Sequence, residues 1–174
     1  MEGPDGPVLA GDGSPEGEPF VIGESVGYLV NFLAKAMARE LAGRLAARGA
    51  SLGQWGVLLF LWAQDGRSQG ELARLVAIED ATMARTIDRM ERDGLVRRER
   101  DAQDRRRVNV FLTEEGRGLR DSLVPCAVAA NEAATRALTG AELEQAKDLM
   151  RRMISALDAA PSARGKGEGD RERT

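Results

Sequence analysis

The chain has 174 residues and a net charge of −3, and 43% of its residues are hydrophobic. This length and composition suit one soluble domain with an appended assembly element. A lone cysteine excludes an internal disulfide, and no segment approaches the roughly 18 apolar residues of a membrane span. The N-terminus also lacks a basic-then-apolar signal. We expect a cytoplasmic protein with no membrane partner.

Both ends of the chain are poor in large apolar side chains. Residues 1–19 hold five glycines and four prolines, and residues 159–174 mix glycine with charged residues. Such segments cannot bury enough apolar surface to offset the entropy lost on folding. Both are therefore predicted to be disordered tails.

Residues 20–50 carry apolar side chains at steps of three or four, the period of one helix face. The pattern predicts a long first helix with these apolar positions: Ile22, Val26, Leu29, Leu33, Met37, Leu41 and Leu45. Ser51 and Gln54 then have the spacing of a capping box, which satisfies free N–H groups at a helix start. A second helix is expected from there.

A helix–turn–helix pattern follows. Ser68 and Glu71 form another capping-box pair and open a short helix that breaks at Ala77–Ile78. The next helix has apolar residues on one face, at Met83, Ile87 and Met90. At about 100° per residue, polar side chains gather on the opposite face within roughly a quarter turn. They are Thr82, Arg85, Arg89 and Arg92.

An arginine-rich hairpin comes next, after Gly94 ends the helix. Leu95 to Arg100 leads to a polar tip at residues 101–107, and Val108 to Leu112 returns with alternating apolar residues. Residues 82–107 hold nine arginines and six acidic residues, so the segment is +3 and the rest of the chain −6. A basic helix face suits a DNA major groove, and a basic ribbon tip suits the neighbouring backbone or minor groove.

Residues 114–158 complete the helical part. Thr113 is placed to cap a helix that starts at Glu114, and Pro125 should kink or divide this helix. Thr139 and Glu142 repeat the capping-box spacing before a last helix. The apolar positions of that helix are Leu143, Leu149, Met150, Met153, Ile154 and Leu157.

The expected fold is mostly α with a small β-hairpin wing. Residues 51–113 form the predicted winged helix–turn–helix domain for double-stranded DNA. The terminal helices carry more apolar length than this domain requires, and such surfaces usually find a partner. Residues 20–50 and 114–158 are therefore predicted to form the dimerisation region of a homodimer that reads a pseudo-palindrome.

The order of these motifs resembles the MarR family of bacterial winged helix–turn–helix regulators. The resemblance covers roughly residues 22–157, and the wing with its trailing Leu-Thr-x-x-Gly is its specific part. The segments that carry it are Gln69-Gly-Glu-Leu-Ala73, Thr82-Met-Ala-Arg-Thr-Ile-Asp-Arg-Met90, Asp93-Gly-Leu-Val-Arg97, Asp101-Ala-Gln-Asp-Arg-Arg106 and Leu112-Thr-Glu-Glu-Gly116. It implies a triangular helical dimer with intertwined terminal helices. It also implies a repressor released by a small phenolic or aromatic carboxylate ligand.

The helix–turn–helix and the wing supply the candidate DNA contacts. An ordinary solvated helix face is the alternative for the arginines, and the adjacent basic hairpin favours DNA. Arg92 lies nearer the helix end, and for this residue DNA contact and a solvated position are equally favoured. The candidates are Ser68, Asp80, Ala81, Thr82, Arg85, Thr86, Arg89, Gln103, Arg105 and Arg106.

The chain departs from the family pattern in two places, one in the wing and one at the start of the recognition helix. Gln103 stands where the family wing commonly has an arginine for the minor groove, so either Arg105 or Arg106 takes the place of that arginine, or Gln103 reads the groove less strongly. Glu79 and Asp80 stand where small hydroxyl residues are usual. Asp80 either accepts from a cytosine amino group or serves as an N-terminal capping residue, and capping is favoured.

Aromatic residues on the first two helices supply candidate walls for a ligand cleft. Flat apolar walls suit an aromatic ligand, and a nearby arginine suits its carboxylate. Core packing is the alternative, and it is favoured for Trp62. The candidate ligand residues are Tyr28, Phe32, Arg48, Trp55, Leu59 and Trp62.

Catalysis and redox sensing find little support. The chain has no histidine, no glycine-rich phosphate loop and no paired-cysteine metal motif, so no enzymatic activity, cofactor or metal is expected. The neighbours of Cys126 supply no base or cation, which favours a buried, inert thiol over an oxidant sensor.

The sequence therefore predicts a homodimeric, ligand-responsive transcriptional regulator, a repressor by family resemblance. The alternative is a winged-helix scaffold for protein interactions whose acidic body avoids DNA. Counterion release separates the two, because DNA binding must weaken steeply as salt rises.

Overall fold

A computed structural model describes residues 8–9, 20–100 and 108–159. The chain falls into two compact units, residues 1–133 and 134–174. The described residues are mostly helical, with a small three-stranded antiparallel sheet in the first unit. The predicted fold class, mostly α with a β-hairpin wing, is confirmed. The limits of the predicted tails and dimerisation region stay predictions.

The first unit begins with a short strand pair, β1 (Val8–Leu9) with β2 (Phe20–Val21). Two residues of the predicted N-terminal tail are therefore paired, and its remainder lies outside the described residues. A single 3₁₀ turn, η1 (Ile22–Glu24), precedes α1 (Val26–Ala46). The predicted first helix thus starts four residues later than its apolar pattern.

Capping boxes open the next two helices, as their spacing predicts. Before α2 (Leu52–Ala63), the Ser51 N–H donates to the Gln54 side chain at 2.8 Å, and the Gln54 N–H donates to the Ser51 hydroxyl at 3.3 Å. The same exchange links Ser68 and Glu71 at the start of α3 (Gln69–Val76). Each box satisfies two N–H groups that the helix leaves unpaired.

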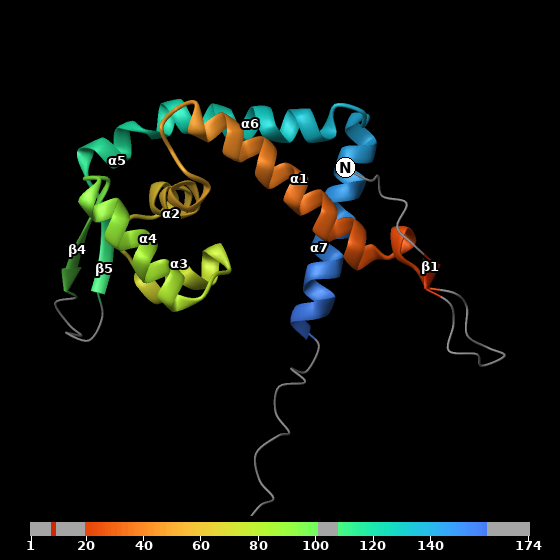
Figure 1. Cartoon of the computed structure of the whole chain (residues 1–174), viewed down its shortest axis with the longest axis horizontal. Coiled ribbons are helices and arrows are strands. Elements are labelled where there is room, and N and C mark those ends of the chain that lie inside the picture. The colour runs from red at the N-terminus through yellow and green to blue at the C-terminus, as the bar shows by residue number, and fades with distance from the viewer. Residues whose placement is uncertain (1–7, 10–19, 101–107, 160–174) are drawn as a thin grey trace, which may run out of the picture. The chain divides into compact units, whose positions relative to one another are not determined.

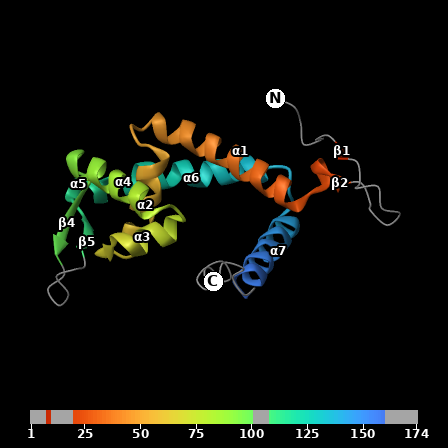
Figure 2. The same ribbon diagram turned by 60° about the horizontal axis from the view of Figure 1, so that its bottom comes forward.

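The wing follows α4 (Asp80–Arg92) and consists of β4 (Val96–Arg100) and β5 (Val108–Leu112). The strands pair antiparallel with Val96 opposite Leu112, and the hairpin projects away from the helices in both views (Figures 1 and 2). A short strand that the sequence pattern does not predict, β3 (Arg67–Ser68), pairs with the other edge of β5. The sheet order is therefore β3-β5-β4, with β4 at an edge.

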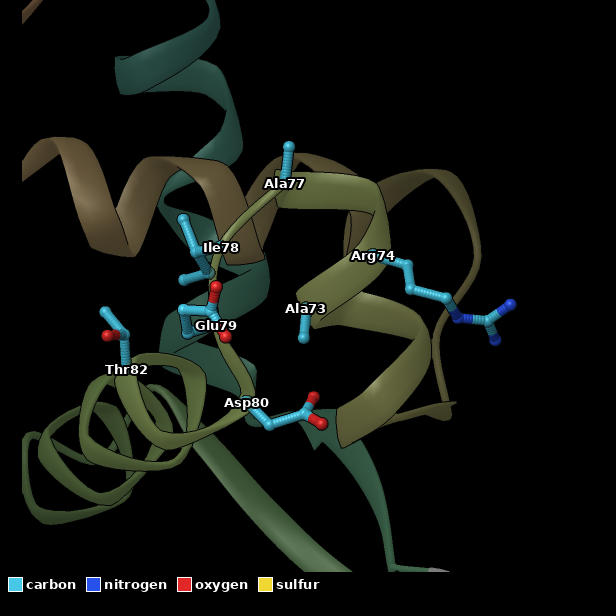
Figure 3. Close-up of a pocket in the computed structure, with 7 residues that line it drawn as sticks. All are labelled: Ala73, Arg74, Ala77, Ile78, Glu79, Asp80 and Thr82. Atoms are coloured by element: carbon cyan, nitrogen blue, oxygen red, sulfur yellow. The ribbon is translucent and has the colours of Figure 1, made fainter. Parts of the chain in front are cut away.

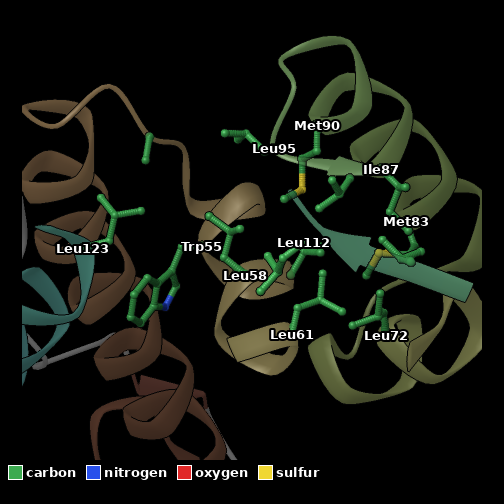
Figure 4. Close-up of a cluster of buried hydrophobic side chains, with 14 of the residues drawn as sticks. Trp55, Leu58, Leu61, Leu72, Met83, Ile87, Met90, Leu95, Leu112 and Leu123 are labelled. Atoms are coloured by element: carbon green, nitrogen blue, oxygen red, sulfur yellow. The ribbon is translucent and has the colours of Figure 1, made fainter. Parts of the chain in front are cut away.

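One hydrophobic core joins these elements (Figure 4). Leu58 and Leu61 of α2 lie between the buried faces of α3, α4 and the sheet. Leu45 of α1 and Leu123 of α6 extend the cluster to the other side of α2. The fully buried side chains with the largest volumes are Leu45, Leu58, Leu61, Leu72, Met83, Ile87, Met90, Leu123, Val57, Val96 and Val110.

A short helix, α5 (Glu114–Gly118), starts where the wing ends. The predicted Thr113 cap is confirmed, because its hydroxyl accepts from the Gly116 N–H at 3.1 Å. The division expected at Pro125 is wrong. α6 (Arg120–Thr135) runs through Pro125, and the break falls at Leu119, six residues earlier. Leu123 and Cys126 anchor α6 in the core on both sides of the proline, which holds the helix together there.

The second unit contains α7 (Gly140–Ala159). Its predicted capping box forms, since the Thr139 N–H donates to Glu142 at 2.7 Å and the Glu142 N–H donates to the Thr139 hydroxyl at 3.3 Å. Hydrogen bonds from the Thr139 backbone and hydroxyl lower the pKa of Glu142. No residue of α7 is buried, although it carries several large apolar side chains.

No helix in the described ranges combines the length and the apolar character that crossing a membrane requires.

The Gly116 position tests how tightly α5 is docked. A Cβ at Gly116 would lie 2.1 Å from the carbonyl oxygen of Leu95, a backbone atom that cannot swing away. Gly116→Ala should therefore lower the free energy of unfolding by about 1–3 kcal/mol, measured from the urea midpoint. Gly118→Ala is the control, because a Cβ at Gly118 meets no atom within 4 Å. Equal midpoints for the two variants would contradict the close contact.

Candidate nucleic-acid interface

The turn between α3 and α4 depends on an alanine with left-handed backbone angles. Ala77 has φ 58° and ψ 47°, and it is the one non-glycine residue with positive φ in the described parts of the chain. The Ile78 N–H donates to the Ala73 carbonyl at 3.0 Å, which closes the end of α3. The sequence predicts the break here, and this conformation redirects the chain into α4.

The core fixes which side of α4 faces water. Met83, Ile87 and Met90 are fully buried, whereas Arg85 and Arg89 are exposed. Successive residues differ by about 100°, so burial of the first three places the two arginines on the outer side. Neither arginine has an ion-pair partner among the residues that the structure describes. The outer face of α4 is therefore a free basic surface.

The other candidate DNA contacts differ in their exposure and in whether their polar groups already bond within the protein. Ala81 and Thr82 are exposed. Thr86 is half-buried, and its hydroxyl donates to the Thr82 carbonyl at 2.9 Å. The Ser68 hydroxyl donates to Glu71 at 2.6 Å, inside the capping box. Ser68 and Thr86 thus use their hydroxyl protons within the fold. Arg92 is exposed and donates to the Asp88 carbonyl at 3.4 Å.

A shallow hollow of about 590 Å³ lies at the helix–turn–helix corner (Figure 3). Glu79 occupies the N-cap position of α4, and its side chain makes no capping hydrogen bond. Asp80 is exposed in the first turn, where a carboxylate meets the positive end of the helix dipole. Figure 3 shows the Arg74 guanidinium pointing away from this corner, so it leaves both carboxylates unneutralised. Asp80 lies one residue inside the helix, after the N-cap position that Glu79 occupies, and its capping role and its base contact both stay predictions.

The wing tip lies outside the described residues. Gln103, Arg105 and Arg106 are all in the segment 101–107, so their DNA contacts stay predictions. The strands below the tip are described, and they reveal two arginines that sequence reasoning does not single out. Arg97 pairs with Glu99 and lies over the Phe111 ring, 5.2 Å from its centroid.

Arg98 points the other way, onto α4. It forms ion pairs with Asp88 at 2.6 Å and Glu91 at 2.8 Å. The alternation of a strand carries the signal for this, because Arg98 shares a face with the buried Val96. The interface helix and the wing strand are therefore joined by side chains.

The candidate ligand residues fall into two groups. Trp55 and Trp62 of α2 meet edge to face, with ring centroids 5.9 Å apart, and Trp55 belongs to the core. The Trp62 indole N–H donates to the Gly116 carbonyl at 3.0 Å, which supports its packing role. Tyr28 and Phe32 stack on each other at 6.1 Å near the start of α1.

The two groups do not converge along α1. Leu45, which shares the core with Trp55, follows Tyr28 by 17 residues of helix, or about 25 Å at the rise of an α-helix. Leu59 and Arg48 are exposed, Leu59 on α2 and Arg48 in the turn after α1. A single cleft lined by all six residues stays a prediction.

Cys126 is buried at 8% exposure, with its sulfur 3.5 Å from the Ser122 carbonyl and 3.7 Å from the Arg44 carbonyl. No cation or base stands beside it in these contacts, in keeping with the interpretation of a structural thiol. In the ranges that the structure describes, no group of three or more histidine, cysteine or acidic residues is placed to hold a metal ion.

These elements define a winged helix–turn–helix domain: a short helix, a turn, an exposed basic helix and a β-hairpin. The family model described as MarR family matches residues 50–108, which covers this domain up to the start of β5.

Curated relatives share this part of the chain. The regulator TtmR of Methylorubrum extorquens is 32% identical over 66% of this chain and 56% of its own length. The repressor NicR of Pseudomonas putida is 36% identical over 53% of this chain and 59% of its own length. The regulator HosA of Escherichia coli O111:H- is 35% identical over 59% of this chain and 76% of its own length. The match thus spans little more than half of TtmR and NicR.

Solved structures extend the similarity. A MarR family regulator from Silicibacter pomeroyi has a TM-score of 0.66 at 30% identity, covering 77% of this chain and 90% of that one. MepR of S. aureus, solved with DNA, has a TM-score of 0.69 at 27% identity over 76% and 98% of the two chains. BpsR of Bordetella bronchiseptica, solved in a study of its regulation by 6-hydroxynicotinic acid, has a TM-score of 0.70 at 28% identity over 75% and 99%. The chain belongs to the MarR family.

The capping role of Ser68, whose hydroxyl both accepts from the Glu71 N–H and donates to the Glu71 carboxylate, can be tested. Ser68→Ala removes the capping box and should lower the free energy of unfolding by about 1 kcal/mol, measured by urea denaturation. Ser68→Asn is the matched control, because asparagine caps helices as well as serine does and should keep the wild-type midpoint. A midpoint for Ser68→Ala that equals the wild type would mean that the box contributes nothing to stability.

Proposed function

We propose that the protein is a homodimeric transcriptional repressor that binds a pseudo-palindromic site in double-stranded DNA and is released by a small aromatic or phenolic ligand. The observation that carries the proposal is the outer face of α4, where Arg85 and Arg89 are exposed without an ion-pair partner among the described residues. A rod of this width with a basic face fits the major groove of B-DNA.

The charge distribution supports DNA as the partner. The chain as a whole is −3, but residues 82–107 carry +3. Local positive charge attracts phosphate, and the acidic remainder discourages unspecific binding elsewhere on the surface. The solved complex of MepR with DNA shows a structural relative engaged with the same kind of partner.

The repressor role and the ligand follow from relatives. NicR is named a repressor, and the DNA binding of BpsR is regulated by 6-hydroxynicotinic acid, an aromatic carboxylate. In this chain the Trp55–Trp62 pair offers flat apolar surface on α2. A ligand that prefers one arrangement of the dimer lowers DNA affinity by shifting the population toward it.

Apolar surface on two helices supports a homodimer. Val26, Leu29, Val30 and Leu33 are exposed on α1. The exposed apolar residues of α7 are Leu149, Met150, Met153, Ile154 and Leu157. A helix that buries none of its residues in one chain gains stability when a second copy covers its apolar face. A dimer also presents two copies of α4 to two half-sites. Under this proposal the protein acts in the cytoplasm and has no catalytic role.

DNA binding by α4 is tested with single arginine substitutions. Arg89→Ala should weaken binding to a duplex selected from a random pool by about 1–3 kcal/mol if Arg89 reads a base. Arg85→Ala should weaken binding in the same way. Titrations at several salt concentrations measure the affinity and its salt dependence, and wild-type binding should fall steeply as salt rises.

Arg120→Ala, at the start of α6, is the charge-matched control, because Arg120 is exposed and lies outside the helix–turn–helix and the wing. It should bind like the wild type. If the wild-type protein selects no duplex at any salt concentration, the proposal of DNA binding is overturned, and a role as a protein-interaction scaffold remains. If Arg89→Ala binds the selected duplex as tightly as the wild type does, Arg89 does not contact DNA.

The homodimer is tested on α7. Replacing Ile154 and Leu157 by glutamate places two charges in the apolar stripe, and the double variant should sediment as a monomer in analytical ultracentrifugation. The control replaces Ala141 and Ser155 by glutamate, and both lie on the side of α7 opposite the apolar stripe at 100° per residue. This control adds two glutamates and should remain a dimer. A wild-type protein that sediments as a monomer would refute the dimer.

A further inference from the structure

Arg98 of β4 makes a concentrated set of polar contacts with α4. Its guanidinium forms an ion pair with Asp88 at 2.6 Å and donates to Glu91 at 2.8 Å and to the carbonyl of Ala84 at 3.3 Å. Its backbone N–H donates to the other carboxylate oxygen of Glu91 at 3.1 Å. The Arg98 side chain is only 23% exposed, less than either acid it binds. One residue of the wing therefore holds three successive turns of the helix.

The helix presents these three acceptors on a single side. Ala84, Asp88 and Glu91 are spaced four and three residues apart, which aligns them along one face of α4. At 100° per residue this face lies between the buried face and the side that carries Arg85 and Arg89. The acids thus flank the basic surface, and Arg98 holds them toward the wing.

The strand contributes a second reason for the contact. β4 is an edge strand, so part of its backbone has no neighbouring strand. The Arg98 N–H is one such group, and the Glu91 carboxylate binds it. A charged acceptor at an edge N–H forms a stronger bond than a neutral one, and it also covers the edge. Helix and strand are thereby linked through both main chain and side chain.

We propose that Arg98 is a positioning residue for DNA recognition. It fixes α4 against β4 so that the basic helix face and the wing reach a duplex in one geometry, and it turns the carboxylates of Asp88 and Glu91 away from phosphate. This inference rests on the proposed DNA binding. Arg98 itself is occupied by α4 and contacts no DNA.

An ordinary surface ion pair contributes little, because solvent screens it and two mobile side chains must be ordered. The Arg98 cluster differs in two respects. The guanidinium reaches two carboxylates and a carbonyl together, and a planar fork with several fixed partners has one favoured orientation. The strand backbone shares one of the same acceptors. Loss of Arg98 therefore allows the angle between α4 and the wing to vary, and it also removes a positive charge.

The test compares two affinities for each variant, one for a duplex that the wild-type protein selects from a random pool and one for a scrambled duplex of equal length. Arg98→Met should lower the ratio of selected to scrambled affinity by about tenfold, the scale of one lost base contact. Phosphate attraction alone acts on both duplexes, whereas geometry acts on the selected one. Urea denaturation confirms that each variant is folded.

Arg97→Met is the matched control. It removes the same charge from the adjacent position of β4, on the opposite face, where Arg97 contacts Glu99 and the Phe111 ring. It should lower both affinities alike and leave their ratio unchanged. An equal loss of the ratio in both arginine variants would overturn the positioning role and show that charge alone matters.

A second variant replaces both Asp88 and Glu91 by alanine and keeps Arg98. Removal of two acids beside a DNA-binding face should strengthen binding to the scrambled duplex, because repulsion of phosphate falls. Positioning predicts that the affinity ratio nevertheless falls, since Arg98 has lost both carboxylates. A ratio at or above the wild-type value would overturn the proposal.

These outcomes are distinct from failure of the proposed function. If the wild-type protein binds no duplex, DNA binding itself is refuted. If it selects a duplex and Arg98→Met keeps the wild-type ratio, DNA binding stands and the positioning role of Arg98 is refuted.

Discussion

Burial of one face of α4 sets the geometry of the whole DNA-binding face. Met83, Ile87 and Met90 are fully removed from water, and each such side chain contributes roughly 1.5–3 kcal/mol relative to an exposed one. An exposed ion pair contributes about 0–1 kcal/mol. The orientation of α4 is therefore set by its apolar side, and the outward position of Arg85 and Arg89 follows from helix geometry without any contact of their own.

The base of the wing is the second fixed point. Asp65, in the loop after α2, accepts from the Leu112 N–H at 2.9 Å and from Arg117 at 2.7 Å, which ties that loop to β5 and α5. Trp62 binds the carbonyl of Gly116, whose own Cα leaves no room for a side chain beside Leu95. α2, β5 and α5 consequently form one packed corner. The Trp55–Trp62 pair of α2 is thus connected to the base of the wing through Gly116 and Asp65.

Two sequence-based expectations show where local patterns are insufficient. Pro125 predicts a kink or a division of the helix, yet α6 is not divided there, because Leu123 and Cys126 are buried on either side and core packing outweighs one lost backbone hydrogen bond. At the start of α4, the residue expected to cap is Asp80, yet Glu79 occupies the N-cap position and Asp80 lies one residue inside the helix. In both cases the residue type states a preference, and the surrounding tertiary contacts determine the outcome.

Local sequence patterns were enough to place most of the helices, the three capping boxes, the break near Ala77 and the outer side of α4, because these features depend on spacing within about ten residues. The resemblance to the MarR family was likewise carried by short sequence motifs. The packed fold was needed to show that Arg98 contacts α4 whereas Arg97 lies over the ring of Phe111. Both are arginines of one strand, but the partners of Arg98 lie on the preceding helix and the aromatic partner of Arg97 lies across the sheet. The alternation of the strand places the two side chains on opposite faces, but the partners that each one meets depend on how the elements pack.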